Sequence, residues 1–177
     1  VKGQRYGSII GTGYRRDEQG NILVDDNGFP LFQDGMNLGY IEPDWTAGLR
    51  NTFSYKNFSL DFLLDTRQGG YLYNGTEELL DFYGVSEKTA SREEDFIFPG
   101  VKESNKQAND IVVKRDGTWW SFAQGNEEYV YENSWLRLRE ANLTYNLSLN
   151  NAKLLKSLSV GVYGRNLWLK TDVPHVG

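Results

Sequence analysis

WTAGLRNTFSYKNFSLDFLLDTR, residues 45–67, is the stretch of this chain with the most regular pattern. Apolar and polar side chains alternate with a period of two on both sides of Lys56 and Asn57, which is the pattern of two β-strands joined by a tight turn. Because a two-residue loop sets the register of a hairpin, Tyr55 is expected opposite Phe58. One face of this hairpin is then almost wholly apolar and aromatic.

The opposite face of the same hairpin is polar and carries charges. Asp61, Asp65 and Arg67 lie on this face, together with Arg50 on the first strand. Arg50 is diagonal to Asp61 and Asp65 in the expected register, so these charges can neutralise one another.

Residues 134–169 predict a second hairpin of the same kind, with Glu140 and Arg165 on its polar face. The alternation is less regular at its start, where Arg137 and Arg139 share the phase of the apolar residues. Either these arginines lie beyond the apolar band, or a bulge near Arg139 shifts the phase and turns the neighbouring leucines outward.

The remaining segments are rich in turns. Residues 1–44 hold two Gly-containing turn signals, and a small hairpin is expected between them. Residues 68–133 form one long connection, with a short helix predicted from Thr76 as N-cap to Gly84 at its C-terminal end. This connection is far longer than an ordinary loop, so either it has a functional role or its assignment as a single loop is wrong. Residues 170–177 are expected to be the start of a truncated loop.

Composition argues against several classes of protein. The 177 residues carry a net charge of −5 and a pI near 5.0, which argues against a nucleic-acid-binding protein. There is no cysteine, and His175 is the single histidine, so thiolate metal sites and Ser/His/Asp triads are not expected. We therefore expect no catalytic residue, no metal and no cofactor. A hydrolase with two catalytic carboxylates is the weakest of the candidate functions that stay open.

Two architectures fit the alternating pattern. The apolar face would be a buried core in a soluble β-sandwich, whereas it would face lipid in a transmembrane antiparallel β-barrel. Strands of about ten residues, a tight turn opposite a very long loop, and aromatic side chains at the strand ends favour the barrel. Trp45 and Trp168 would lie on the long-loop side and Tyr55 on the turn side. The alternative that stays open is a soluble, extracellular glycan-binding β-sandwich with Trp119 and Trp120 as its platform.

Five stretches of the chain carry a resemblance to a known family. They are YGSIIG at 6–11, RDEQGNILVDDNGFP at 16–30, PDWTAGLRNTFSYKNFSLDFLLDTRQGG at 43–70, ENSWLRLREANLTYNLSL at 132–149 and GRNLWLKTDVP at 164–174. In this order they resemble the C-terminal portion of SusC/RagA-type, TonB-linked outer-membrane transporters. The stretches together are specific to that family, although each alone is a weak signal.

The resemblance implies that residues 1–177 are all-β and belong to the C-terminal part of a 22-stranded barrel in a Gram-negative outer membrane. It implies three partners besides outer-membrane lipid: a SusD-like surface lipoprotein that lids the barrel, an oligosaccharide or oligopeptide substrate, and the TonB system. The TonB system would act through the missing N-terminal part. Residues 68–133 would then be a long extracellular loop, and the chain would be part of an importer rather than an enzyme.

The candidate site residues fall into two groups. Four polar-face residues are expected to be structural and to face the lumen: Arg50, Asp61, Glu140 and Arg165. Four residues are candidates for substrate contact: Asp65, Arg67, Trp119 and Trp120. The two tryptophans would stack on a sugar ring, unless they pack the loop onto itself or against the lid.

Overall fold

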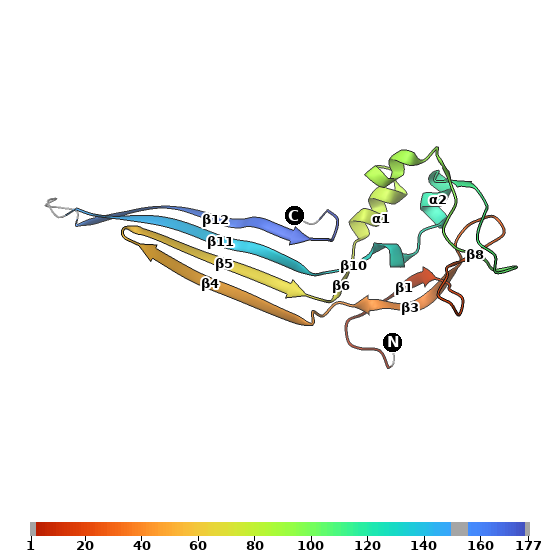
Figure 1. The fold of residues 1–177 in the computed structure, drawn as a ribbon, viewed down its shortest axis with the longest axis horizontal. Helices are drawn as coiled ribbons and strands as arrows, with labels where there is room; N and C mark the ends of the chain where they lie inside the picture. The colour runs from red at the N-terminus through yellow and green to blue at the C-terminus, as the bar shows by residue number, and fades with distance from the viewer. Residues whose placement is uncertain (1–2, 150–155, 176–177) are drawn as a thin grey trace. The chain divides into compact units, whose positions relative to one another are not determined.

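The computed structural model describes residues 3–149 and 156–175 (Figure 1). The chain divides into two compact units, and each is described by itself. The sheet unit comprises residues 43–70 and 132–172, and the core unit comprises residues 3–42, 71–131 and 173–175. No helix in the described part of the chain is long and apolar enough to cross a membrane.

The sheet unit is a four-stranded antiparallel sheet with the strand order β12-β11-β5-β4 (Figure 1). Its strands are β4 (Trp45–Tyr55), β5 (Phe58–Gln68), β11 (Trp135–Ser148) and β12 (Ser157–Thr171). Tyr55 lies opposite Phe58, so the predicted register of the first hairpin is confirmed. Lys56, the first residue of the two-residue turn, has a left-handed backbone conformation with a φ of 53°.

The two hairpins are joined by pairing between β5 and β11. Phe58 lies opposite Tyr145 and Leu64 opposite Leu138, although these partners are more than 70 residues apart in the sequence. This register places the alternating apolar residues of all four strands on one face of the sheet. The periodicity of each hairpin did not predict this pairing, because a period of two says nothing about which strands are neighbours.

A β-bulge interrupts β11 at Arg139. The register shifts between Leu138 and Glu140 against both neighbouring strands. On the β12 side, Asn166 takes a left-handed conformation with a φ of 50°. The bulge confirms the second of the two interpretations of this segment, since Leu138 now shares the apolar face with Leu64, and the arginines face the polar side.

The core unit is built from short elements. Its strands are β1 (Ser8–Tyr14), β2 (Leu23–Val24), β3 (Phe32–Tyr40), β6 (Tyr71–Tyr73), β7 (Asp95–Phe96), β8 (Val101–Lys102), β9 (Val113–Lys114) and β10 (Val130–Glu132), the last residue of which falls in the sheet unit. Its helical segments are α1 (Gly75–Phe82), η1 (Glu87–Ser91), α2 (Gly117–Phe122) and η2 (Asn126–Tyr129). The pairs are β1 with β3, β2 with β8, β6 with β10, and β7 with β9.

The small hairpin expected within residues 1–44 takes a different form. Isolated bridges join Arg16 to Ile22 and Val24 to Pro30, while β2 pairs in parallel with β8. The Asp25 carboxylate accepts hydrogen bonds from the backbone of Asn27 and Phe29, which closes the predicted acidic turn. The turns were therefore predicted correctly, but the neighbour of β2 comes from a distant part of the chain.

Helix α1 forms where expected but with a different cap. The Asn74 side chain accepts a hydrogen bond from the Glu77 backbone N–H at 3.1 Å, so the predicted Thr76 N-cap is wrong. Asn74 is the better cap because its short side chain lies just before the first helical residue. Gly84 directly follows Tyr83, the C-cap of α1, and has a φ of 70°. This is the position expected for a glycine that ends a helix.

Helix α2 lies in the segment expected to be irregular. Asp116 caps it by accepting hydrogen bonds from the N–H groups of Thr118 and Trp119. The helix carries Trp119 and Trp120 into a core with Tyr14, Phe98 and other buried side chains. Residues 71–131 therefore pack with residues 3–42 into a compact unit with its own hydrophobic core.

The GTG sequence at residues 11–13 allows η2 to approach the open edge of β1. The N–H groups of Thr12 and Tyr14 donate to the side chains of Asn126 and Glu127, respectively. A Cβ on Gly13 would stand 2.9 Å from the Glu127 carboxylate, so a larger residue would push this carboxylate away. Side chains thus take the place that a neighbouring strand would occupy along this edge.

Candidate functional site

The sheet unit presents an exposed apolar face. Val162 is 77% exposed, Phe53 57% and Leu49 55% in the described structure. The ring of Phe53 stacks on that of Phe62, its diagonal neighbour on β5, with ring centroids 6.0 Å apart. Among the described residues, no second sheet packs over these side chains. Large apolar side chains in such a continuous array require an apolar surrounding.

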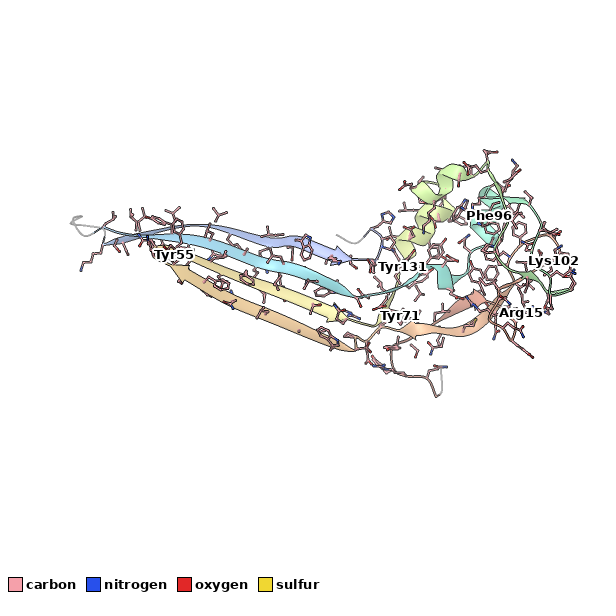
Figure 2. All side chains as sticks on the ribbon, viewed as in Figure 1. Arg15, Tyr55, Tyr71, Phe96, Lys102 and Tyr131 are labelled. Atoms are coloured by element: carbon pink, nitrogen blue, oxygen red, sulfur yellow. The ribbon has the colours of Figure 1, made fainter. Side chains whose placement is uncertain are left out.

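Aromatic residues gather at the turn end of this face. The rings of Phe58 and Tyr145 lie 4.8 Å apart, and the Asn57 amide donates to the Tyr145 hydroxyl at 3.4 Å. Figure 2 shows Tyr55 at the same end of the sheet. Rings with a polar tip suit a boundary between an apolar and an aqueous phase.

The polar face carries an ion-pair network that crosses all four strands. Arg50 Nη2 lies 3.0 Å from Asp61 Oδ1 and 3.6 Å from Glu140 Oε2. Arg165 approaches the other oxygen of Glu140 at 3.9 Å, and Thr52 donates to Asp61 at 2.8 Å. The structure therefore brings together the four residues predicted to be structural, and the predicted pairing of Arg50 with Asp61 is confirmed.

Asp65 belongs to a second network on the same face. Its Oδ2 atom accepts hydrogen bonds from Arg139 at 2.6 Å and from Arg137 at 3.4 Å. Asp65 therefore pairs with the arginines around the bulge, while the diagonal partner expected for it, Arg50, pairs with Asp61 and Glu140. Sequence reasoning missed this pairing, although the broken alternation at Arg139 was a signal that could have found it.

Asp65 also lines a hollow of about 330 Å³ beside the bulge. Gly48, Trp135 and Arg139 are among its other lining residues. Arg67 lies on the same face as Asp65, opposite Thr46 and Trp135 in the register of the sheet. The two polar candidates for substrate contact are thus neighbours on one face.

The polar face as a whole has an excess of positive charge. Its arginines are 50, 67, 137, 139 and 165, and its carboxylates are Asp61, Asp65 and Glu140. Each of these carboxylates is already engaged by at least one arginine. Such a face can hold polar or charged groups but not lipid tails.

The structure places the two predicted stacking residues in the core. Trp119 is 2% exposed and Trp120 8% exposed. Phe29, Phe96 and Phe98 surround the Trp119 ring at centroid distances of 5.4 to 5.7 Å. Stacking on a sugar requires an open ring face, so we assign both residues to the core of this unit. They pack partly within their own segment, which was one of the alternatives considered, and partly against residues 3–42 such as Phe29.

Residues 3–149 and 156–175 hold no group of three or more histidine or acidic side chains placed to bind a metal ion.

Two curated relatives match nearly the whole chain. A TonB-dependent receptor of Formosa agariphila is 26% identical over 174 residues, which is 97% of this chain and 16% of the receptor. A second TonB-dependent receptor of the same organism is 28% identical over 163 residues, which is 85% of this chain and 14% of the receptor. The chain therefore spans about a sixth of the length of these relatives.

A solved structure matches as well. The RagAB peptide importer in its closed-closed state aligns with a TM-score of 0.58 at 18% identity, over 90% of this chain and 17% of that one. The resemblance to SusC/RagA-type, TonB-linked transporters is confirmed. No family model matches the chain. The relatives are named as receptors and an importer rather than as enzymes, in agreement with the expectation of a non-enzymatic chain.

Proposed function

We propose that this chain is part of an outer-membrane importer of glycans or oligopeptides. The sheet unit would form four strands of a closed β-barrel wall, and the core unit would form its outer loops. The importer would act with a SusD-like lipoprotein lid and take its energy from the TonB system. The relatives support this proposal because they are named as TonB-dependent receptors and a peptide importer.

The observation that carries the proposal is the contrast between the two faces of the sheet. One face exposes large apolar side chains such as Leu49 and Val162, and the other holds arginines and carboxylates in ion pairs. A wall between lipid and an aqueous lumen needs this combination, since lipid solvates only the apolar face. The outer edges of β4 and β12 have no strand partner in the described residues, so the barrel must supply one to each.

The experiment uses the full-length protein in its native membrane. Extraction of isolated outer membranes should release it only with detergent, and heating should shift its mobility on a gel, because a closed barrel unfolds only on boiling. Release by salt or alkali alone, with no heat-dependent shift, would contradict the proposed barrel wall.

Transport is tested separately from membrane insertion. Cells that depend on the importer should lose uptake of its substrate when TonB or the co-purifying lipoprotein is deleted. Uptake that persists in both deletions would contradict the proposed mechanism while leaving the barrel wall in place.

A further inference from the structure

Residues 173–175 follow the last strand of the sheet unit along the chain, but they belong to the core unit. We call them the strap. Val173 is buried, with 5% of its surface exposed. The Pro174 carbonyl oxygen accepts a hydrogen bond of 2.8 Å from the side chain of Asn74, which is also the N-cap of α1. The strap is therefore bound at the N-terminal end of α1.

His175 places its side chain against a buried carboxylate. Its Nε2 atom lies 2.6 Å from Oε2 of Glu77, a residue in the first turn of α1 that is 2% exposed. The backbone of His175 is left-handed, with a φ of 57°, which is uncommon for a residue other than glycine. Such a conformation persists only where the surrounding contacts offset its cost, so the contact with Glu77 helps to hold the strap in place.

The carboxylate of Glu77 stays charged. Lys88 of η1 lies 2.5 Å from its Oε1 atom, so each of the two oxygens faces a different base. Burial acts to raise the pKa of Glu77, but Lys88 and His175 outweigh it and hold the pKa below its usual range. A negative charge therefore faces His175 at every pH near neutrality.

The other ionisable side chains around this pair are of types that ordinarily titrate away from neutral pH. They are Glu78 and Asp81 on α1, Lys88 on η1, Tyr129 on η2 and Tyr131 on β10. Asp81 accepts a hydrogen bond from Ser86 Oγ at 2.5 Å and lies 3.7 Å from Lys88 Nζ. Burial, followed by the charge of Asp81, raises the pKa of Tyr129, so that hydroxyl stays protonated. Histidine is the side chain in this group whose ordinary pKa lies between 5 and 8.

Protonation changes what a histidine offers to a carboxylate. A charged ring adds ion-pair attraction to the hydrogen bond, and charge-assisted hydrogen bonds are roughly twice as strong as neutral ones. We propose that the strap is a pH-sensitive clasp on α1, which holds most firmly when His175 is protonated and opens more often as the pH rises and the ring loses its proton. The proposal goes beyond the transport function, since it concerns the core unit alone.

The experiment measures how often the strap opens in the full-length protein in detergent. Val173→Cys places a thiol at the buried position of the strap, and a maleimide labels this thiol only when the strap is released. Mass spectrometry of the peptide that carries residue 173 gives the labelling rate. This rate is divided by the rate for the same variant unfolded in denaturant at the same pH, because thiol reactivity itself depends on pH.

The ratio of the two rates should rise about two- to fivefold between about pH 5.5 and about pH 8, as expected for the loss of a half-exposed ion pair. His175→Gln keeps a side-chain N–H donor without a charge, and it should remove this rise. Lys88→Gln is the matched control. It removes the other base at Glu77, so the ratio should be higher at every pH and should still rise with pH.

Hydrogen exchange of residues 170–175 runs in parallel with proteins that keep Val173, in case the cysteine itself loosens the strap. The protection factor, which compares exchange with that of an unfolded chain at the same pH, should fall with rising pH in the wild type and stay constant in His175→Gln. A wild-type protection factor that does not change with pH would overturn the proposal. An equal pH dependence in the two proteins, in either measurement, would overturn it as well.

Discussion

Arg139 Nη1 donates to Asp65 Oδ2 at 2.6 Å across two paired strands, although the two residues are 74 positions apart in the sequence. The contact exists because the bulge at Arg139 turns its side chain to the polar face, where Arg137 also reaches Asp65. Asp65 thus ties the second hairpin to the first on the face that we propose to line the lumen.

Replacing Asp65 should therefore loosen the junction between the hairpins. Asp65→Asn leaves two arginines without their carboxylate, and we expect a loss of about 1–3 kcal/mol in the free energy of unfolding. Denaturant unfolding of the full-length protein in detergent measures this loss. Asp95→Asn removes an exposed ion pair with Lys114 in the core unit and should cost less than about 1 kcal/mol. Equal losses in the two variants would argue against the junction.

The two faces of β5 predict opposite responses at adjacent positions. Leu60→Arg puts a charge on the apolar face, and it should cost about 2–4 kcal/mol of unfolding free energy if that face meets lipid near the middle of the membrane. Asp61→Asn on the polar face should cost much less, because its partner Arg50 is largely exposed and water solvates that guanidinium once the carboxylate charge is lost. The measurement is again unfolding in detergent or lipid vesicles, and similar losses at the two positions would show that the assigned faces are wrong.

The cap of α1 predicts that Asn74 matters more than Thr76. Asn74→Ala removes the bond from the Glu77 N–H and also the 2.8 Å bond that the Asn74 amide donates to Pro174 O. A lost cap costs about 0.5–2 kcal/mol, whereas Thr76→Ala should have little effect. Hydrogen exchange of the α1 amides in the full-length protein compares the two variants, and faster exchange in Thr76→Ala than in Asn74→Ala would contradict the assignment.

The pairing of Glu127 predicts an acid-sensitive contact in the core unit. Burial acts to raise the pKa of Glu127, but the hydrogen bonds from Arg16 and from the Tyr14 backbone outweigh it and hold the pKa below its usual range. A carboxyl whose pKa is lower in the folded state than in the unfolded state contributes its full stabilisation above the unfolded pKa of about 4.3. This contribution is lost as the pH falls through the folded pKa. Acidification through the folded pKa of Glu127 should therefore lower the protection factor of the Tyr14 amide, which is its exchange rate relative to that of an unfolded chain at the same pH.

Glu127→Gln tests the source of this acid sensitivity. The variant should exchange faster than the wild type at neutral pH, because Arg16 loses its charged partner. The ratio of the two exchange rates, measured at the same pH, should approach one as the pH falls, since the wild-type carboxyl then becomes neutral as well. A ratio that stays constant with pH would show that the Glu127 charge does not stabilise this contact.

The sequence by itself determined the strands and their faces. Alternation over residues 45–67 predicted the first hairpin. It also predicted Tyr55 opposite Phe58, because a two-residue turn allows only one register between the two strands. The broken alternation at the start of β11 left two interpretations, and one of them was the bulge at Arg139. These features depend on neighbours in the sequence, so local periodicity is enough to predict them.

The tertiary structure decided which distant segments meet. The pairing of β5 with β11, the contact of Asp65 with Arg139, and the burial of Trp119 and Trp120 each join residues far apart in the chain. Local patterns carry no information about such partners, because aromatic residues suit an exposed platform and a packed core equally well. The choice between them depends on the total apolar surface that the folded unit can bury, and that surface is defined only once residues 3–42 and 71–131 pack together.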